Sequence, residues 1–499
     1  MKTNWIRDIV AVAAVTAALV AQTGYGVDYV WSGGGDGSTF SDAANWTPSS
    51  AAPVGAADRA IFKTPGTFNV NVTQAFTNAG VMVQQGNVTF NAGSAYFYTT
   101  ALQIGTQKFH QATFTMITCT GKVGTLDVGR VYDPATGNGT AGSLNLLAKA
   151  RLISVGQVSI GYYNGAVALT GTVVVSDSAL STASNANMYV GYGGVGRLSV
   201  TNGSHVDCKV FSMNERKGLT NFPIRTTVQV GGGSGASVLK IFGANSLNSV
   251  GTYPNGFEYM REPITSEIII YPGGVVHDEN GPFIYYPGST LTLAGGEFYE
   301  RYNNLVFTGS VFRGSGQVRV LSKAYPQFYV SLRPSAGVCD WPWGAVTVTN
   351  YAKMSPGTPE SPIGAIELKD WSGPLEVRPK CMLDFDLAGT AAGEYDRILA
   401  TNGTVYLGLM SSPGSGGAII NVALTNNFVP VNGNYFDVLT CTNIIESDLS
   451  LVTFNWPAQP ANLTWTPSII TNVVPRYTNE VLRLTVSGGA PKGTLITVW

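Results

Sequence analysis

The sequence predicts an all-β protein that folds as a right-handed parallel β-helix, a solenoid of stacked coils. A short apolar run that ends on glycine recurs, at 102–105, 126–129, 158–161, 188–191 and 228–231. Apolar residues alternate within each run, which is the period of a strand with one buried face. The chain holds 60 glycines and 25 prolines, and no long stretch after the first 22 residues has helical apolar spacing. Repeated short strands between dense turns fit stacked coils better than a series of β-sandwiches, whose strands are longer.

Residues 1–26 are predicted to be a secretory signal peptide. Lys2 and Arg7 give a positively charged start, residues 9–21 form an apolar run, and small residues follow. The apolar run is too short to cross a bilayer as a helix. We therefore expect this segment to be cleaved on export, with an uncleaved anchor as the alternative.

Residues 27–59 are predicted to form an N-terminal cap. Trp31 and Trp46 flank a glycine-rich turn within this segment. The first coil of a solenoid leaves its apolar interior open, and large aromatic side chains cover such an opening with few residues.

Residues 60–350 are predicted to form the coils, and residues 351–499 a C-terminal β-rich region of capping or sandwich type. The second region has longer alternating runs, at 382–387 and 481–486, which fit end-cap or sandwich strands. Within the coils, the apolar residues of the recurring strands are expected to face inward. These are Ile104, Leu126, Val128, Val158, Ile160, Val190, Leu198, Val200, Val228 and Val230.

The composition argues against several classes of function. Charged residues make up 12% of the chain and the net charge is −1, so we expect no basic surface for nucleic acid or anionic membrane. No cofactor and no metal are expected, because the three histidines are far apart and no phosphate-loop or metalloprotease motif occurs. The five cysteines are scattered, without Cys-x-x-Cys spacing. We expect buried thiols or a disulfide, and Cys381 with Cys441 is the first pair to test.

Three segments resemble the β-strand-repeat proteins that bacteria with an outer membrane secrete. They are the opening with Trp31, Asn45 and Trp46, the repeat at 189–203, and the segment 355–439. The family includes autotransporter passengers and extracellular proteins with a PEP-CTERM sorting tail. The resemblance implies a parallel β-helix, export and a location outside the cell or on its surface, but no common activity. The translocator barrel and the sorting tail of such proteins are absent from this sequence, so self-transport is not expected.

Aromatic residues crowd the stretch 253–307, and tyrosines there are candidate ligand-binding residues. Tyrosine offers sugar rings an apolar face and a polar tip. The alternative is that these rings stack inside the coils. Tyr285 and Tyr286 are adjacent, so on one strand they are expected to face opposite ways. The candidate set is Tyr259, Tyr285, Tyr286, Tyr299 and Tyr302.

Acidic residues are the candidate catalytic groups if the protein is an enzyme. Asp384 and Asp386 alternate with apolar residues, so both carboxylates are expected on one outward strand face, either solvated or working together. Clusters at 277–279 and 297–302 are the other polar groups, and two carboxylates at suitable separation can hydrolyse a glycoside. Asp396 lies three residues after Gly393 and precedes an apolar strand, so we expect a structural role for it.

These observations together predict a secreted or cell-surface structural or adhesive β-solenoid without catalysis of its own. Polysaccharide or matrix components are the expected partners, and the mature chain is expected to have no transmembrane span. The alternatives are a β-helix polysaccharide lyase or glycoside hydrolase, and a carbohydrate-binding module.

Overall fold

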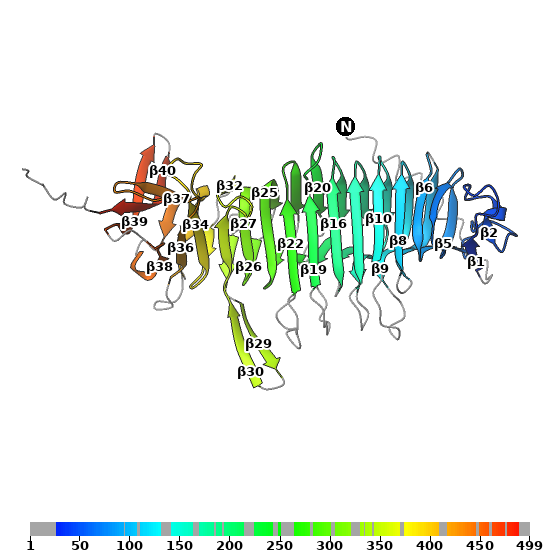
Figure 1. The fold of residues 1–499 in the computed structure, drawn as a ribbon, viewed down its shortest axis with the longest axis horizontal. Coiled ribbons are helices and arrows are strands. Elements are labelled where there is room, and N and C mark those ends of the chain that lie inside the picture. The colour runs from blue at the N-terminus through cyan, green and yellow to red at the C-terminus, as the bar shows by residue number, and fades with distance from the viewer. Residues whose placement is uncertain are drawn as a thin grey trace, which may run out of the picture.

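The chain forms one elongated stack of β-strands, with the N-terminal strands at one end and the C-terminal strands at the other (Figure 1). The computed structural model describes residues 26–93, 95–106, 110–130, 141–162, 169–183, 186–191, 194–213, 224–242, 248–250, 264–279, 283–300, 305–320, 330–333, 335–341, 344–369, 374–408, 417–445, 449–458, 462–474 and 477–488. These ranges contain forty strands, the short 3₁₀ helices η2 (Ala43–Asn45) and η5 (Leu449–Leu451), and no α-helix. The predicted signal peptide therefore lies almost wholly outside the described residues.

Each coil contributes one strand to each of three parallel sheets, which we call sheets I, II and III. The coil of β13 (Thr170–Ser176), β14 (Ala179–Thr182) and β15 (Asn187–Val190) lies on the coil of β16 (Val195–Thr201), β17 (His205–Cys208) and β18 (Val210–Met213). Residues of one coil pair in register with their counterparts in the next. The protein is therefore an all-β solenoid of the parallel β-helix type, as the sequence predicts.

Long strands bend round the corners and so belong to two sheets. Sheet I contains β13 and β16 with β4 (Thr67–Asn71), β6 (Gly86–Asn91), β8 (Gln111–Ile117), β10 (Ala141–Leu147), β19 (Ile224–Val230), β22 (Ile264–Ile270), the first parts of β25 (Ser289–Glu300) and β27 (Val311–Val320), β31 (Lys353–Pro356), β34 (Met382–Leu387), β36 (Ile419–Leu424) and β38 (Thr453–Asn455).

Sheet II contains β14 and β17 with the first parts of β5 (Phe76–Val83), β7 (Tyr96–Ile104) and β9 (Thr120–Arg130), then β11 (Arg151–Ser154), β20 (Ser237–Ile241), β23 (Gly274–Asp278), the second parts of β25 and β27, β32 (Ala365–Lys369), and the first parts of β35 (Arg397–Tyr406) and β37 (Tyr435–Ile445).

Sheet III contains β15 and β18 with β1 (Asp28–Trp31), β3 (Arg59–Phe62), the second parts of β5, β7 and β9, β12 (Val158–Tyr162), β21 (Asn248–Val250), β24 (Phe283–Tyr285), β26 (Leu305–Thr308), β28 (Val330–Arg333), β33 (Pro374–Val377) and the second parts of β35 and β37.

The interior is the continuous core between these sheets. All ten residues that were predicted to face inward are at most 1% exposed. Aromatic rings stack along this core from coil to coil, as Phe76 does on Phe97 with ring centroids 5.5 Å apart. Tyr285 stacks in the same way on Phe307, with a centroid separation of 4.8 Å. The alternation beside each glycine therefore reports burial correctly.

The recurring glycines turn the chain from sheet III toward the next strand of sheet I. Gly129 and Gly161 have φ of 67° and 70°, in the left-handed region that other residues avoid. A Cβ on Gly161 would lie 2.1 Å from the carbonyl oxygen of Val195, so the contact also leaves no room for a side chain. The first four repeated runs stack on one another in sheet III, whereas the fifth, 228–231, lies in sheet I. The repeated sequence pattern therefore occurs at two different corners of the coil.

Aromatic rings gather at the N-terminal end of the stack, within residues 27–59, although β1 of this segment already pairs with β3 in sheet III. Trp31 and Trp46 meet edge to face with ring centroids 4.9 Å apart, and both are 1% exposed. Phe40 stacks on Phe76 of the first coils at 4.1 Å. The buried amide of Asn45 closes the glycine-rich turn, because its oxygen accepts two backbone N–H groups and its nitrogen donates twice.

The C-terminal boundary predicted at residue 351 is wrong, because parallel coils continue well past it. Strand β27 pairs with β31 and β32, and parallel pairing persists from β36 to β38, which ends at Asn455. Only then does an antiparallel layer close the stack, formed by β37, β40 (Tyr477–Ser487) and β39 (Thr464–Val474). Near residue 351 the chain instead extends an antiparallel hairpin, β29 (Ser335–Trp341) and β30 (Gly344–Asn350), away from the stack (Figure 1).

The described cysteines are separate, buried thiols. Cys381 and Cys441 are both free and fully buried, so the disulfide suggested between them does not form. Cys119 and Cys208 are likewise free and buried. The side chain of Cys339 lies outside the described residues. These four cysteines are therefore buried thiols, which was the alternative to a disulfide.

Candidate ligand-binding faces

Two of the five candidate tyrosines are buried in the structure. Tyr285 is fully buried, and Tyr286 is 4% exposed. The expectation that one of the two faces outward is wrong, because β24 ends at Tyr285 and strand alternation stops there. Tyr286 opens a turn in which its carbonyl oxygen accepts the N–H of Ser289 at 3.1 Å. Tyr259 and Tyr302 lie outside the described residues.

Tyr299 is the candidate tyrosine that lies partly exposed, on the outer face of sheet II. Its hydroxyl donates a hydrogen bond to Glu297, and Arg319 lies 3.3 Å from the same carboxylate and 5.8 Å from the Tyr299 ring centroid. Burial, together with the bond to Glu297, raises the pKa of Tyr299. On the neighbouring strand His277 meets the ring edge-on at 5.9 Å. Glu297 is thus engaged both by the Tyr299 hydroxyl and by Arg319.

The acidic pair Asp384 and Asp386 lies on sheet I as the alternation predicts. Both side chains are on the outward face of β34, between the buried Leu383, Phe385 and Leu387. Asp384 forms an ion pair with Lys353 and accepts a hydrogen bond from the Asn421 amide at 2.7 Å. Burial and the neighbouring Asp384 raise the pKa of Asp386.

Asp396 lies directly behind this pair and is fully buried. One carboxyl oxygen accepts the N–H of Gly364 at 2.8 Å and the other accepts the N–H of Asp386 at 2.9 Å. Burial raises the pKa of Asp396 to about 8, against the lowering effect of the two N–H donors. The carboxyl joins backbone segments of different strands, which accords with the structural role predicted for it.

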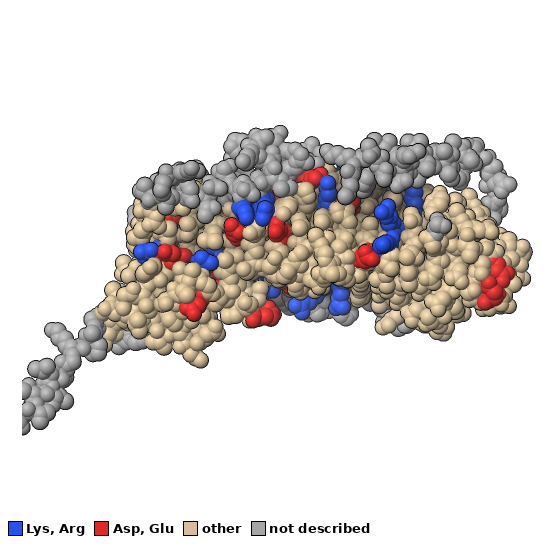
Figure 2. Space-filling view, turned by 90° about the horizontal axis from the view of Figure 1, so that it is seen from above, with Lys and Arg blue, Asp and Glu red and all other residues tan. Residues whose placement is uncertain are grey.

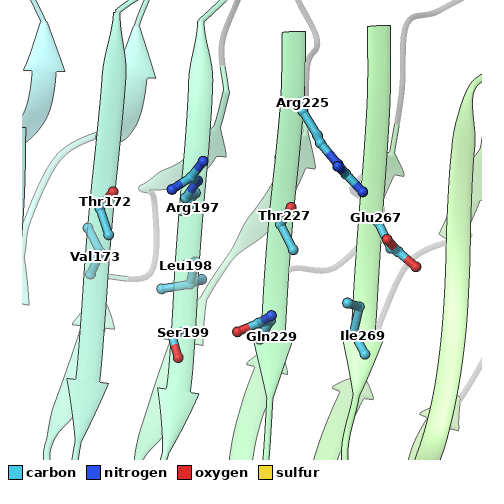
Figure 3. A pocket seen from close by; sticks show the side chains of 10 residues that line it. All are labelled: Thr172, Val173, Arg197, Leu198, Ser199, Arg225, Thr227, Gln229, Glu267 and Ile269. Carbon is cyan, nitrogen blue, oxygen red and sulfur yellow. The ribbon is translucent and has the colours of Figure 1, made fainter. Parts of the chain in front are cut away.

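A shallow groove on the outer face of sheet I is a feature that sequence reasoning missed. It has a volume of about 470 Å³ and crosses four neighbouring strands, β13, β16, β19 and β22 (Figure 3). We call it the arginine groove. Its lining consists of Thr172, Val173, Arg197, Leu198, Ser199, Arg225, Thr227, Gln229, Glu267 and Ile269.

Alternation supplies the polar lining of the arginine groove. Along β16 and β19 every second residue is buried in the core, so Arg197, Ser199, Thr227 and Gln229 point outward. Register then sets Arg197 beside Thr227, with Arg225 two residues back on the same strand as Thr227. The outward alternation of these side chains is visible in the sequence. Their assembly into one groove is not, because it depends on which strand follows which after loops of unequal length.

The charges of the groove do not cancel one another. Arg197 and Arg225 are exposed, and neither forms an ion pair or hydrogen bond within the described part of the chain. Glu267 is instead held by Arg313, 2.7 Å away on the next coils, and by the Thr292 hydroxyl at 2.6 Å. Among the described residues the groove therefore has two guanidinium groups outside any ion pair, and Arg225 points toward Glu267 (Figure 3). On the face seen in Figure 2 the charged side chains are few and of both signs.

Within the described ranges, no three His, Cys, Asp or Glu side chains gather as a metal site would require. No helix there is long and apolar enough to cross a membrane. Neither protein-family models nor curated proteins give a match to this chain.

Proposed function

We propose that the protein is a secreted or cell-surface β-solenoid with a structural or adhesive role, and that it binds polysaccharide along the outer face of sheet I. The observation that carries this proposal is the arginine groove. It is open along the stack and lined by hydroxyl, amide and guanidinium groups from four successive coils. A polymer laid along the stack meets such groups coil after coil, and repeated weak contacts add up to useful affinity.

The location outside the cell follows from separate reasoning. The first 26 residues have the pattern of a signal peptide, and the chain resembles exported β-strand-repeat proteins of bacteria with an outer membrane. The long array of coils suits such a setting, because each coil contacts only its neighbours and the stack can present one extended surface.

Affinity electrophoresis on gels containing different polysaccharides tests the binding. We expect at least one polysaccharide to retard the folded protein, while assays for new reducing ends and for unsaturated products stay at background. A protein that no polysaccharide retards would remove the carbohydrate role and leave a purely structural one.

A glycoside hydrolase or polysaccharide lyase is the second candidate, and one observation favours it. Asp384 and Asp386 share the outward face of β34, and the raised pKa of Asp386 is a property of general acids. Against it, Lys353 and Asn421 already engage Asp384. Turnover of a polysaccharide that Asp386→Asn abolishes, while Glu360→Gln leaves it unchanged, would replace the non-enzymatic proposal.

A further inference from the structure

The two arginines of the groove differ from the other cations on the same face. Arg313 pairs with Glu267, and Lys353 pairs with Asp384. Arg197 and Arg225 stand exposed on adjacent strands without a described partner. In a chain with only 12% charged residues, two arginines on adjacent strands, with Glu267 of the groove already paired with Arg313, form a local excess of positive charge.

The spacing of the two arginines suits one extended ligand. They lie on neighbouring strands and two residues apart along them, since Arg197 pairs with Thr227. With strands about 4.8 Å apart and a rise of about 3.3 Å per residue, their backbones are about 8 Å apart. Both arginines line the same groove, in which Arg197 stays beside β16 and Arg225 extends toward Glu267 on β22 (Figure 3). Successive charged groups of one polymer can therefore be held at the same time.

The chemistry of the lining identifies the ligand class. A guanidinium binds carboxylate or sulfate oxygens through two parallel N–H donors. The neighbouring Ser199, Thr227 and Gln229 supply neutral donors and acceptors of the kind that sugar hydroxyl groups use. Glu267 does not oppose an anion strongly, because Arg313 balances its charge.

We propose that the arginine groove binds an anionic polysaccharide, whose carboxylate or sulfate groups are held by Arg197 and Arg225. The inference rests on the proposed function and narrows its ligand. It requires binding to weaken with added salt, because contacts between exposed charges are screened.

Two matched pairs of polymers test the charge requirement without any variant. Dextran sulfate is compared with dextran, and polygalacturonate with its methyl ester, by affinity electrophoresis and by titration at low and high salt. We expect the protein to bind a charged polymer and not its neutral counterpart. Binding of dextran sulfate would indicate a sulfate ligand, and binding of polygalacturonate would indicate a carboxylate ligand. Equal retention by charged and neutral members would overturn the inference while leaving polysaccharide binding intact. Retention by no polymer would sink the proposed function itself.

Variants then assign the site. Arg197→Gln and Arg225→Gln are each expected to weaken binding about tenfold, since hydrogen bonds between charged groups are the stronger ones. Arg151→Gln is the matched control, because Arg151 is an exposed arginine on sheet II. Unchanged melting temperatures show that the variants fold. Equal losses in all three variants, or single-stranded DNA binding as tightly as the polysaccharide and through the same arginines, would refute a glycan site in this groove.

Discussion

Replacement of Asp396 by asparagine is the sharpest test of how the C-terminal coils are held together. The side chain is fully buried, and each carboxyl oxygen accepts one backbone N–H, from Gly364 and from Asp386. Asparagine keeps one acceptor oxygen but turns an NH₂ group toward the second N–H. An unsatisfied buried donor costs about 1–3 kcal/mol, so Asp396→Asn is expected to lower the melting temperature measurably.

The raised pKa of Asp396 predicts how the stability difference between wild type and variant changes with pH. Burial raises the pKa of Asp396 to about 8 from the ordinary value of 3.8, so the folded state holds the proton more tightly than the unfolded state. The stabilising contribution is complete below pH 4 and is lost as the pH rises toward 8, by about 1.4 kcal/mol per pH unit. Asparagine does not titrate, so the stability advantage of the wild type over the variant should shrink as the pH rises from 5 and reverse before pH 8, because a loss of about 1.4 kcal/mol per pH unit exceeds a difference of about 1–3 kcal/mol within about two pH units.

Differential scanning calorimetry at several pH values between 4 and 9 measures both effects. The control is Glu360→Gln, which removes an exposed carboxylate and should leave the melting temperature unchanged at every pH. Polysaccharide binding by the folded Asp396→Asn protein should equal that of the wild type. A variant that melts with the wild type at all pH values, or a wild-type advantage that grows as the pH rises, would refute the reasoning.

Three further predictions concern other parts of the stack. Gly161→Ala places a Cβ 2.1 Å from a backbone oxygen at a φ of 70°, so we expect a lower yield of folded protein and a melting temperature reduced by several degrees. Asn45→Ala removes a buried amide with four hydrogen bonds, and hydrogen exchange should speed up in the N-terminal cap while the central coils stay protected. Burial raises the pKa of Cys381 and Cys441 to about 12, so both should resist alkylation at pH 8 until the protein is denatured. Rapid alkylation of the native protein, or a disulfide found by mass spectrometry, would contradict the prediction for the two cysteines.

Local patterns in the sequence predicted local structure well. Alternation beside the glycines identified the buried side of strands such as β12 and β16, because a strand has two faces and one of them lines the core. The outward pair Asp384 and Asp386 was predicted for the same reason. The structural role of Asp396 was predicted from its place between a turn and a strand, where aspartate accepts backbone N–H groups. These features depend on neighbours within a few residues, which a sequence displays directly.

Features that depend on the stacking of coils were harder to predict. The run at 228–231 looks like the four before it, yet it lies in a different sheet. The end of β24 at Tyr285 turned Tyr286 inward, although adjacent strand residues alternate. The arginine groove combines residues from coils joined by loops of unequal length. Strand ends, and the order in which strands stack after loops of unequal length, decide these features, and neither is visible in a short stretch of sequence.

At the corner between sheet III and sheet I, glycines of successive coils are in close backbone contact. We call this contact the glycine joint. A Cβ on Gly171 would lie 2.1 Å from the backbone nitrogen of Gly161, and one on Gly196 would lie 2.2 Å from that of Gly191. Because this joint is made of backbone alone, successive coils meet there in the same way whatever side chains and loops they carry elsewhere. Duplication or loss of a whole coil leaves the joint intact, whereas a single side chain added at the joint disturbs two coils at once. The length of the array is therefore easier to change in evolution than the chemistry of its corner.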